Sequence, residues 1–113
     1  MAKDDYYVIA YKILAYLYMR LKNGEPAEAE MLKCDGELFQ INRTYWTYII
    51  SNMIDQGFIQ GFTDSSKGNG FALEMQLSSC EITPKGIDYL FDNSLMERAK
   101  QVLKEVKEIT PFL

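Results

Sequence analysis

Five polar side chains between Arg43 and Ser51 follow the spacing of one helix face. They are Arg43, Thr44, Thr47, Tyr48 and Ser51. Hydroxyl groups at this spacing can hydrogen-bond phosphates or base edges, and an arginine near a helix start can reach a guanine edge or a phosphate. The chemistry that this pattern predicts is contact with double-stranded DNA in the major groove, while a solvated polar face is the alternative.

A helix over about residues 42–56 would position these side chains. Apolar residues with a 3.6-residue period form its other face: Trp46, Ile49, Ile50, Met53 and Ile54. Asn42 is a suitable N-cap, and Gly57 is suited to the position after the last turn. The β-branched and aromatic residues from Thr44 to Ile50 are also typical of a strand. The continued helical period and both caps favour the helix.

The apolar period changes from 3.6 to 2 directly after Gly57. Residues 58–63 and 71–78 therefore predict two strands, and residues 64–70 (DSSKGNG) predict the loop of a β-hairpin between them. Lys67 at the tip of this loop could contact a minor groove or a backbone phosphate. A single lysine with Asp64 nearby is also typical of an ordinary soluble turn.

Four more helices complete the predicted order. They cover residues 5–22, residues 27–34, a segment that Thr83 and Pro84 begin, and a last segment from a Ser94/Glu97 capping box to Pro111. Three helices, a hairpin and two helices predict an α+β winged helix-turn-helix with additional C-terminal helices. We expect a single domain, with residues 1–93 as the winged helix and residues 94–113 as an amphipathic helix added to it.

Composition supports one ordinary globular domain with an acidic surface. The chain has 113 residues, of which 48% are hydrophobic and 25% are charged. The formal net charge is −4. Proteins that bind DNA by releasing counterions need a positive surface, so any basic footprint must be local. Arg43 is the only basic residue from 43 to 56.

Catalytic and metal chemistry have little support in the residue types. The chain has no histidine, and Cys34 and Cys80 are far apart with no CxxC spacing, so we expect two idle thiols and no metal or cofactor. No phosphate-binding loop or paired acid and base is visible, and we expect no enzyme activity. The N-terminus lacks the pattern of a signal peptide, and no stretch has roughly 20 apolar residues, so we expect a cytoplasmic protein.

Four segments carry a resemblance to a known family. They are DDYYVIAYKILAYLY, YWTYIISNMIDQGFIQGF, ITPKGIDYL and the tail AKQVLKEVKEI. Together they resemble the YjcQ-like family, small proteins of Firmicutes and their phages. The resemblance covers nearly the whole chain and implies a winged-helix fold, without defining a biochemical role. The segment ITPKG is also similar to the LTxxG step after the wing in many regulators of the MarR and PadR types.

Two functions remain open at this stage. One is a phage-type DNA-binding transcriptional regulator that acts as a homodimer through residues 95–109, although this apolar stripe could instead fold back onto the first helix. The other is a winged-helix protein-interaction module that does not bind DNA. Tyrosines expected at the surface favour the second function because they suit protein interfaces: Tyr7, Tyr11, Tyr18 and Tyr48.

Overall fold

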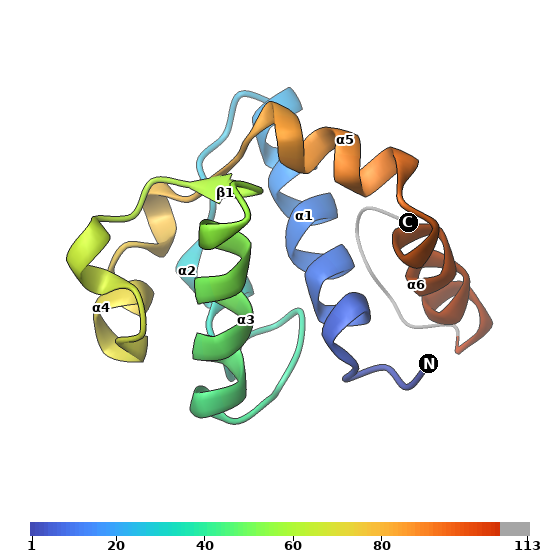
Figure 1. Cartoon of the computed structure of the whole chain (residues 1–113), viewed down its shortest axis with the longest axis horizontal. Coiled ribbons are helices and arrows are strands. Elements are labelled where there is room, and N and C mark those ends of the chain that lie inside the picture. The colour runs from blue at the N-terminus through green and yellow to red at the C-terminus, as the bar shows by residue number, and fades with distance from the viewer. Residues whose placement is uncertain (107–113) are drawn as a thin grey trace.

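The computed structural model describes residues 1–106, and Ile109 and Pro111 of the predicted last helix lie outside these residues. The fold is α+β and mostly helical, with one small antiparallel sheet of two strands (Figure 1). The helices are α1 (Tyr6–Lys22), α2 (Ala29–Leu32), α3 (Arg43–Asp55), α4 (Gly70–Met75), α5 (Pro84–Asp92) and α6 (Ser94–Glu105). The strands are β1 (Ile59–Gln60) and β2 (Glu81–Ile82). Two 3₁₀ turns, Asp64–Ser66 and Leu77–Ser79, flank α4.

Helix α1 is the centre of the core. Every residue from Val8 to Leu17 is buried, and α1 contacts α3, α5, α6 and β2. Figure 1 shows α1 standing between α3 and α6, with α5 crossing above. Because α1 is covered on several sides, its buried surface is wider than the single apolar stripe that the sequence predicts.

Helix α3 begins and ends where the sequence predicts. The Asn42 side chain accepts a hydrogen bond of 2.8 Å from the Tyr45 amide, and Gly57 adopts a φ of +78° after the last turn. Trp46 is fully buried, and its indole N–H donates to the Leu32 carbonyl at 2.9 Å. One face of α3 is therefore fixed in the core, and its orientation is set.

Helix α2 is shorter than the predicted helix over 27–34 and has only four residues.

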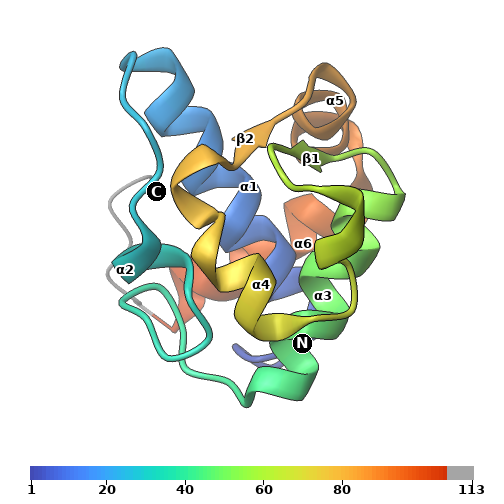
Figure 2. The ribbon, with the colours of Figure 1, turned by 90° about the vertical axis from the view of Figure 1, so that its left-hand side faces the viewer.

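The predicted β-hairpin over residues 58–78 is wrong in its second strand. Strand β1 pairs instead with β2, with Ile59 opposite Ile82 and Gln60 opposite Glu81. Residues 71–75, predicted as strand, lie in helix α4, and the predicted wing loop 64–70 leads into it through a 3₁₀ turn. The connection between the two strands is thus a helical segment, and Figure 2 shows α4 below the sheet and beside α3.

The last two helices close the far side of the core. Helix α5 begins at the predicted cap, where the Thr83 side chain accepts from the Gly86 amide. The N-cap of helix α6 is Asn93 and not the predicted Ser94, because the Asn93 side chain accepts from the Leu95 amide. Ser94 is therefore the first residue of the helix. Its apolar face, including Met96, Ala99 and Leu103, is buried and packs on α1 and α5. The fold-back arrangement is therefore present within the described chain.

Candidate interaction surfaces

One edge of the polar face of α3 that was predicted to bind DNA packs against α4 and the loop before it. The approach is close, because a Cβ atom added at Gly70 would lie 2.5 Å from the Thr47 hydroxyl and 3.1 Å from Arg43 Cγ. Only a glycine fits between these side chains. The 67–74 segment is therefore packed tightly against this edge of α3.

Arg43 is held in this interface. Its Nη1 atom lies 2.6 Å from Glu74 Oε2, and its guanidinium carbon lies 4.2 Å from the centre of the Phe71 ring. The hydrogen bond from Arg43 to Glu74 raises the pKa of the guanidinium further above its ordinary value. The only basic residue of α3 is thus already paired with a carboxylate and an aromatic ring.

The other end of the same interface is closed by Lys67. Its Nζ atom lies 2.6 Å from Asp55 Oδ1 at the end of α3, and this hydrogen bond to Asp55 raises the pKa of Lys67. Next to it, the Gly68 amide donates to the Ser51 hydroxyl at 3.1 Å. Lys67 is therefore beside α3 rather than at the tip of a projecting wing.

Of the six predicted DNA-binding residues, the structure separates two from the other four. Four of them lie at the contact between α3 and the 67–74 segment. Arg43 pairs with Glu74, Ser51 accepts from the Gly68 amide, and Lys67 pairs with Asp55. The Thr47 hydroxyl donates to the Arg43 carbonyl within α3. Thr44 and Tyr48 remain exposed, and 60% of the Tyr48 side chain is accessible. The open part of α3 is therefore the face around Tyr48.

That open face belongs to a cluster of aromatic side chains from three helices. We use the name tyrosine cluster for Tyr6 and Tyr7 of α1, Tyr45 and Tyr48 of α3, and Tyr89 of α5. Together with Asn52 and Gln56 they line a cavity of about 360 Å³. Tyr6 makes edge-to-face contacts with Tyr7 at 5.2 Å and with Tyr48 at 6.1 Å. Every side chain in this lining is uncharged at neutral pH.

Burial raises the pKa of three phenols in the cluster. Desolvation is the largest cause for Tyr6, Tyr45 and Tyr89. For Tyr45 the carboxylates of Asp4 and Asp5 raise the pKa further. These phenols therefore stay protonated at physiological pH and can act as hydrogen-bond donors.

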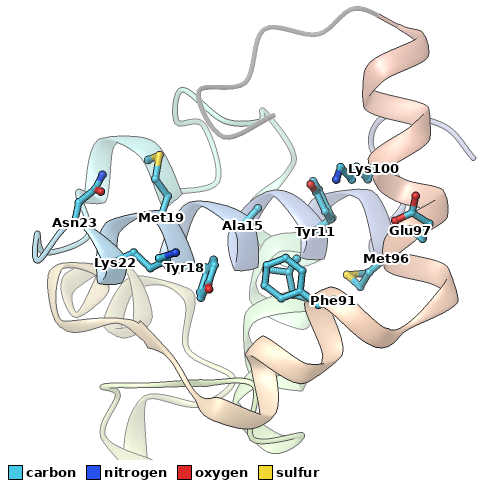
Figure 3. A pocket seen from close by; sticks show the side chains of 11 residues that line it. Tyr11, Ala15, Tyr18, Met19, Lys22, Asn23, Phe91, Met96, Glu97 and Lys100 are labelled. Carbon is cyan, nitrogen blue, oxygen red and sulfur yellow. The ribbon is translucent and has the colours of Figure 1, made fainter.

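A second and larger groove of about 520 Å³ runs between α1, α5 and α6. Its floor includes Tyr18 and Phe91, which contact edge to face at 5.2 Å. Figure 3 shows Lys22 at one end of the groove, and Glu97 and Lys100 at the other. Because its charged groups lie at opposite ends and do not converge, the groove offers apolar contact area without a focused polar site.

Sequence reasoning singled out Tyr7 and Tyr48 but missed the other three tyrosines of this surface. Of the four tyrosines expected outside, Tyr48 is exposed, Tyr7 and Tyr18 are half-buried, and Tyr11 is buried. The roles of Tyr6, Tyr45 and Tyr89 depend on how three helices meet, and no local spacing carries that information. Glu74, the partner of Arg43, was missed because its segment was assigned to a strand.

Other site classes find no support among residues 1–106. No group of three His, Cys, Asp or Glu side chains there could hold a metal ion. Both Cys34 and Cys80 are buried free thiols. None of the helices in this part of the chain is long and apolar enough to cross a bilayer.

Comparison with known proteins gives one result. The sequence profile of a family described as YjcQ protein matches residues 11–109, which is most of the chain. No curated protein and no solved structure matches the chain.

Proposed function

This chain belongs to the YjcQ family, and we propose that it is a protein-interaction module that binds a partner at the tyrosine cluster. The observation that carries this proposal is the gathering of five tyrosines from α1, α3 and α5 around one uncharged cavity. The cluster includes the part of α3 that the rest of the fold leaves open.

Tyrosine is well suited to such a surface. It supplies a large contact area with few rotatable bonds and a hydroxyl that can pair with a partner, and it is enriched at interface centres. Here the edge-to-face contacts of Tyr6 limit the movement of its neighbours Tyr7 and Tyr48. Rings that are already ordered lose less conformational entropy when a partner binds.

The charges on α3 weaken a DNA-binding role. Binding to duplex DNA draws most of its free energy from cations that neutralise phosphates. Arg43 and Lys67, which were predicted to do this, are paired with Glu74 and Asp55. A phosphate that used either cation would have to compete with the carboxylate already paired with it.

An unbiased peptide selection would test the proposal. The full chain is offered a random display library, and enriched peptides are measured against the wild type, the exposed variant Tyr48→Ala and the matched control Phe91→Ala. Phe91 is 63% exposed but lines the other groove. We expect peptides that lose at least about tenfold in affinity with Tyr48→Ala, about 1.4 kcal/mol, and keep it with Phe91→Ala. Failure to enrich any peptide, or equal affinity for all three proteins, would overturn the proposal.

The second candidate is the DNA-binding transcriptional regulator with a winged-helix fold. It is supported by the order of three helices followed by an antiparallel strand pair, and by the exposure of Thr44 and Tyr48 on α3. A fluorescence titration with random-sequence duplex at low and moderate salt tests it. This candidate requires affinity that falls steeply with salt and that weakens with Arg43→Ala.

A further inference from the structure

The rings of the tyrosine cluster form walls and not a flat platform. The Tyr6 ring makes an angle of 78° with the Tyr7 ring and 74° with the Tyr48 ring. On α5, the Tyr89 ring stacks on the ring of Phe58 with 4.3 Å between the ring centres, and Phe58 is buried. Upright, anchored rings give the cavity walls of aromatic faces and edges, on which flat aliphatic rings such as those of proline can pack.

Three of the five hydroxyl groups in the tyrosine cluster have no hydrogen-bond partner among residues 1–106. Within residues 1–106 no hydrogen bond involves the hydroxyl of Tyr7, Tyr48 or Tyr89, whereas Tyr45 donates to the Asp4 carbonyl at 2.9 Å. A ligand that brings hydrogen-bond acceptors could pair with these hydroxyl groups. A proline-rich segment presents carbonyl oxygens and has few competing N–H groups.

The lining also disfavours other kinds of ligand. It contains no lysine or arginine, so it lacks the cations that single-stranded nucleic acids need along the backbone. It contains no leucine, isoleucine or methionine, so it lacks the aliphatic surface that takes the apolar face of a helix. Tyrosines with two amide side chains match the aromatic-lined grooves that take extended proline-rich peptides.

Charge at one edge of the cluster gives the ligand a direction. Asp4 and Asp5 lie next to Tyr45, as the hydrogen bond to the Asp4 carbonyl shows. Neither carboxylate forms an ion pair with a cation among the described residues, and the carboxylate of Asp5 accepts a hydrogen bond from the Ala2 amide. A basic side chain at one end of the ligand would find two carboxylates there.

We propose that the tyrosine cluster binds a proline-rich segment of a partner protein in the polyproline II conformation, with an arginine or lysine at one end of the segment over Asp4 and Asp5. This inference rests on the proposed function, because it names the partner chemistry of the same surface. Proline pre-orders the segment, so binding costs little chain entropy.

A designed pair of peptides tests it. The probe is a proline-rich peptide with one terminal arginine, and its control has alanine in place of each proline. Isothermal titration to the full chain is expected to give saturable binding of the probe, and binding of the control about tenfold weaker or worse, which is about 1.4 kcal/mol. Tyr48→Ala should abolish the difference. Asp4→Lys should weaken binding of the probe but not of a version with alanine in place of its arginine, and Phe91→Ala should change none of these affinities.

The outcomes separate this inference from the function on which it rests. If the proline probe does not bind, but proline-free peptides from the random library bind and depend on Tyr48, the proline-rich ligand is wrong and the protein-interaction function stands. If neither the probe nor any library peptide binds, both are overturned. If Tyr48→Ala has the same thermal unfolding midpoint as the wild type, its loss of binding is not a loss of folding.

Discussion

At the scale of single residues, Cys80 is the most strongly perturbed ionisable group among residues 1–106. It is buried, and desolvation, with a smaller effect of Glu81, raises the pKa of its thiol from 9.0 to about 12. A thiol in this state is almost entirely protonated at physiological pH and is a poor nucleophile. The expectation of an idle thiol therefore has a physical cause in the fold.

The Cys80 thiol should make the protein lose stability in alkali. Between pH 9 and about pH 12 the folded state keeps the thiol proton while the unfolded state releases it. The free energy of unfolding therefore falls as pH rises through this window, and the contribution is complete below it. Urea unfolding followed by Trp46 fluorescence should show a shallower alkaline decline for Cys80→Ala than for the wild type. Parallel declines would contradict the assignment.

Arg43 shows what residue spacing can and cannot predict. The shared face of Thr44, Thr47, Tyr48 and Ser51 follows from helical geometry and is present in α3. What covers that face depends on Glu74 and Gly70, which come from a segment about 30 residues later along the chain. The residue types predicted a polar face correctly, but its neighbours give Arg43 a role inside the fold.

At the scale of elements, α4 is where the sequence-based prediction failed. The alternation of Phe71, Leu73, Met75 and Leu77 is typical of a strand with one buried face, but only Leu73 and Leu77 are buried. Those two are four residues apart, which is the helical spacing, whereas Phe71 is 69% and Met75 is 85% exposed. Alanine, leucine, glutamate, methionine and glutamine all favour helix, and Asn69 caps it.

The helical nature of α4 predicts a specific effect of bulk at Gly70. Gly70→Val should push α4 away from α3, because its Cβ would meet the Thr47 hydroxyl and the Arg43 side chain. We expect a loss of about 1–3 kcal/mol in the free energy of unfolding. Gly68→Asn is the matched control, because Gly68 has a φ of +77° with open space around it and asparagine tolerates that conformation. Equal stability of Gly70→Val and wild type would contradict the packing described.

The contact between α5 and β1 predicts a second glycine requirement. A Cβ at Gly86 would collide with the Phe58 carbonyl and approach Ile82 Cγ1 to 2.8 Å. Because the first obstacle is backbone, Gly86→Ala should lower the free energy of unfolding by about 1–3 kcal/mol or more. Denaturant unfolding measures this, and a neutral Gly86→Ala would show that α5 does not pack so closely on the strand.

At the scale of the whole molecule, local signals predicted most of the helices but not the long-range pairing. Caps at Asn42 and Thr83 and the glycine at 57 fixed the bounds of α3 and the start of α5. The partner of β1 could not be found in this way, because Ile82 lies more than 20 residues away, beyond a helix. The tyrosine cluster is of the same kind, since it exists only when α1, α3 and α5 meet.

The arrangement of α6 makes a prediction about assembly. Its apolar residues Met96, Ala99 and Leu103 are buried on α1 within one chain, so they are not free to pair with a second copy through residues 95–109. We expect a monomer of 13.1 kDa at micromolar concentration. Light scattering measures this mass, and a dimer that Val106→Lys dissociates would contradict the prediction.

The central proposal is that α3 presents a protein-binding surface around Tyr48, and that Arg43 and Lys67 of its predicted DNA face stay in their ion pairs. The most direct test adds random-sequence duplex DNA at low salt to isotope-labelled protein and follows the amide signals of residues 43–55 and 67–74 by NMR. We predict no shifts along this face, because Arg43 and Lys67 stay paired with Glu74 and Asp55. Shifts centred on Arg43, Thr47, Ser51 and Lys67 that disappear as salt rises would show that the face opens to DNA, and would contradict the claim.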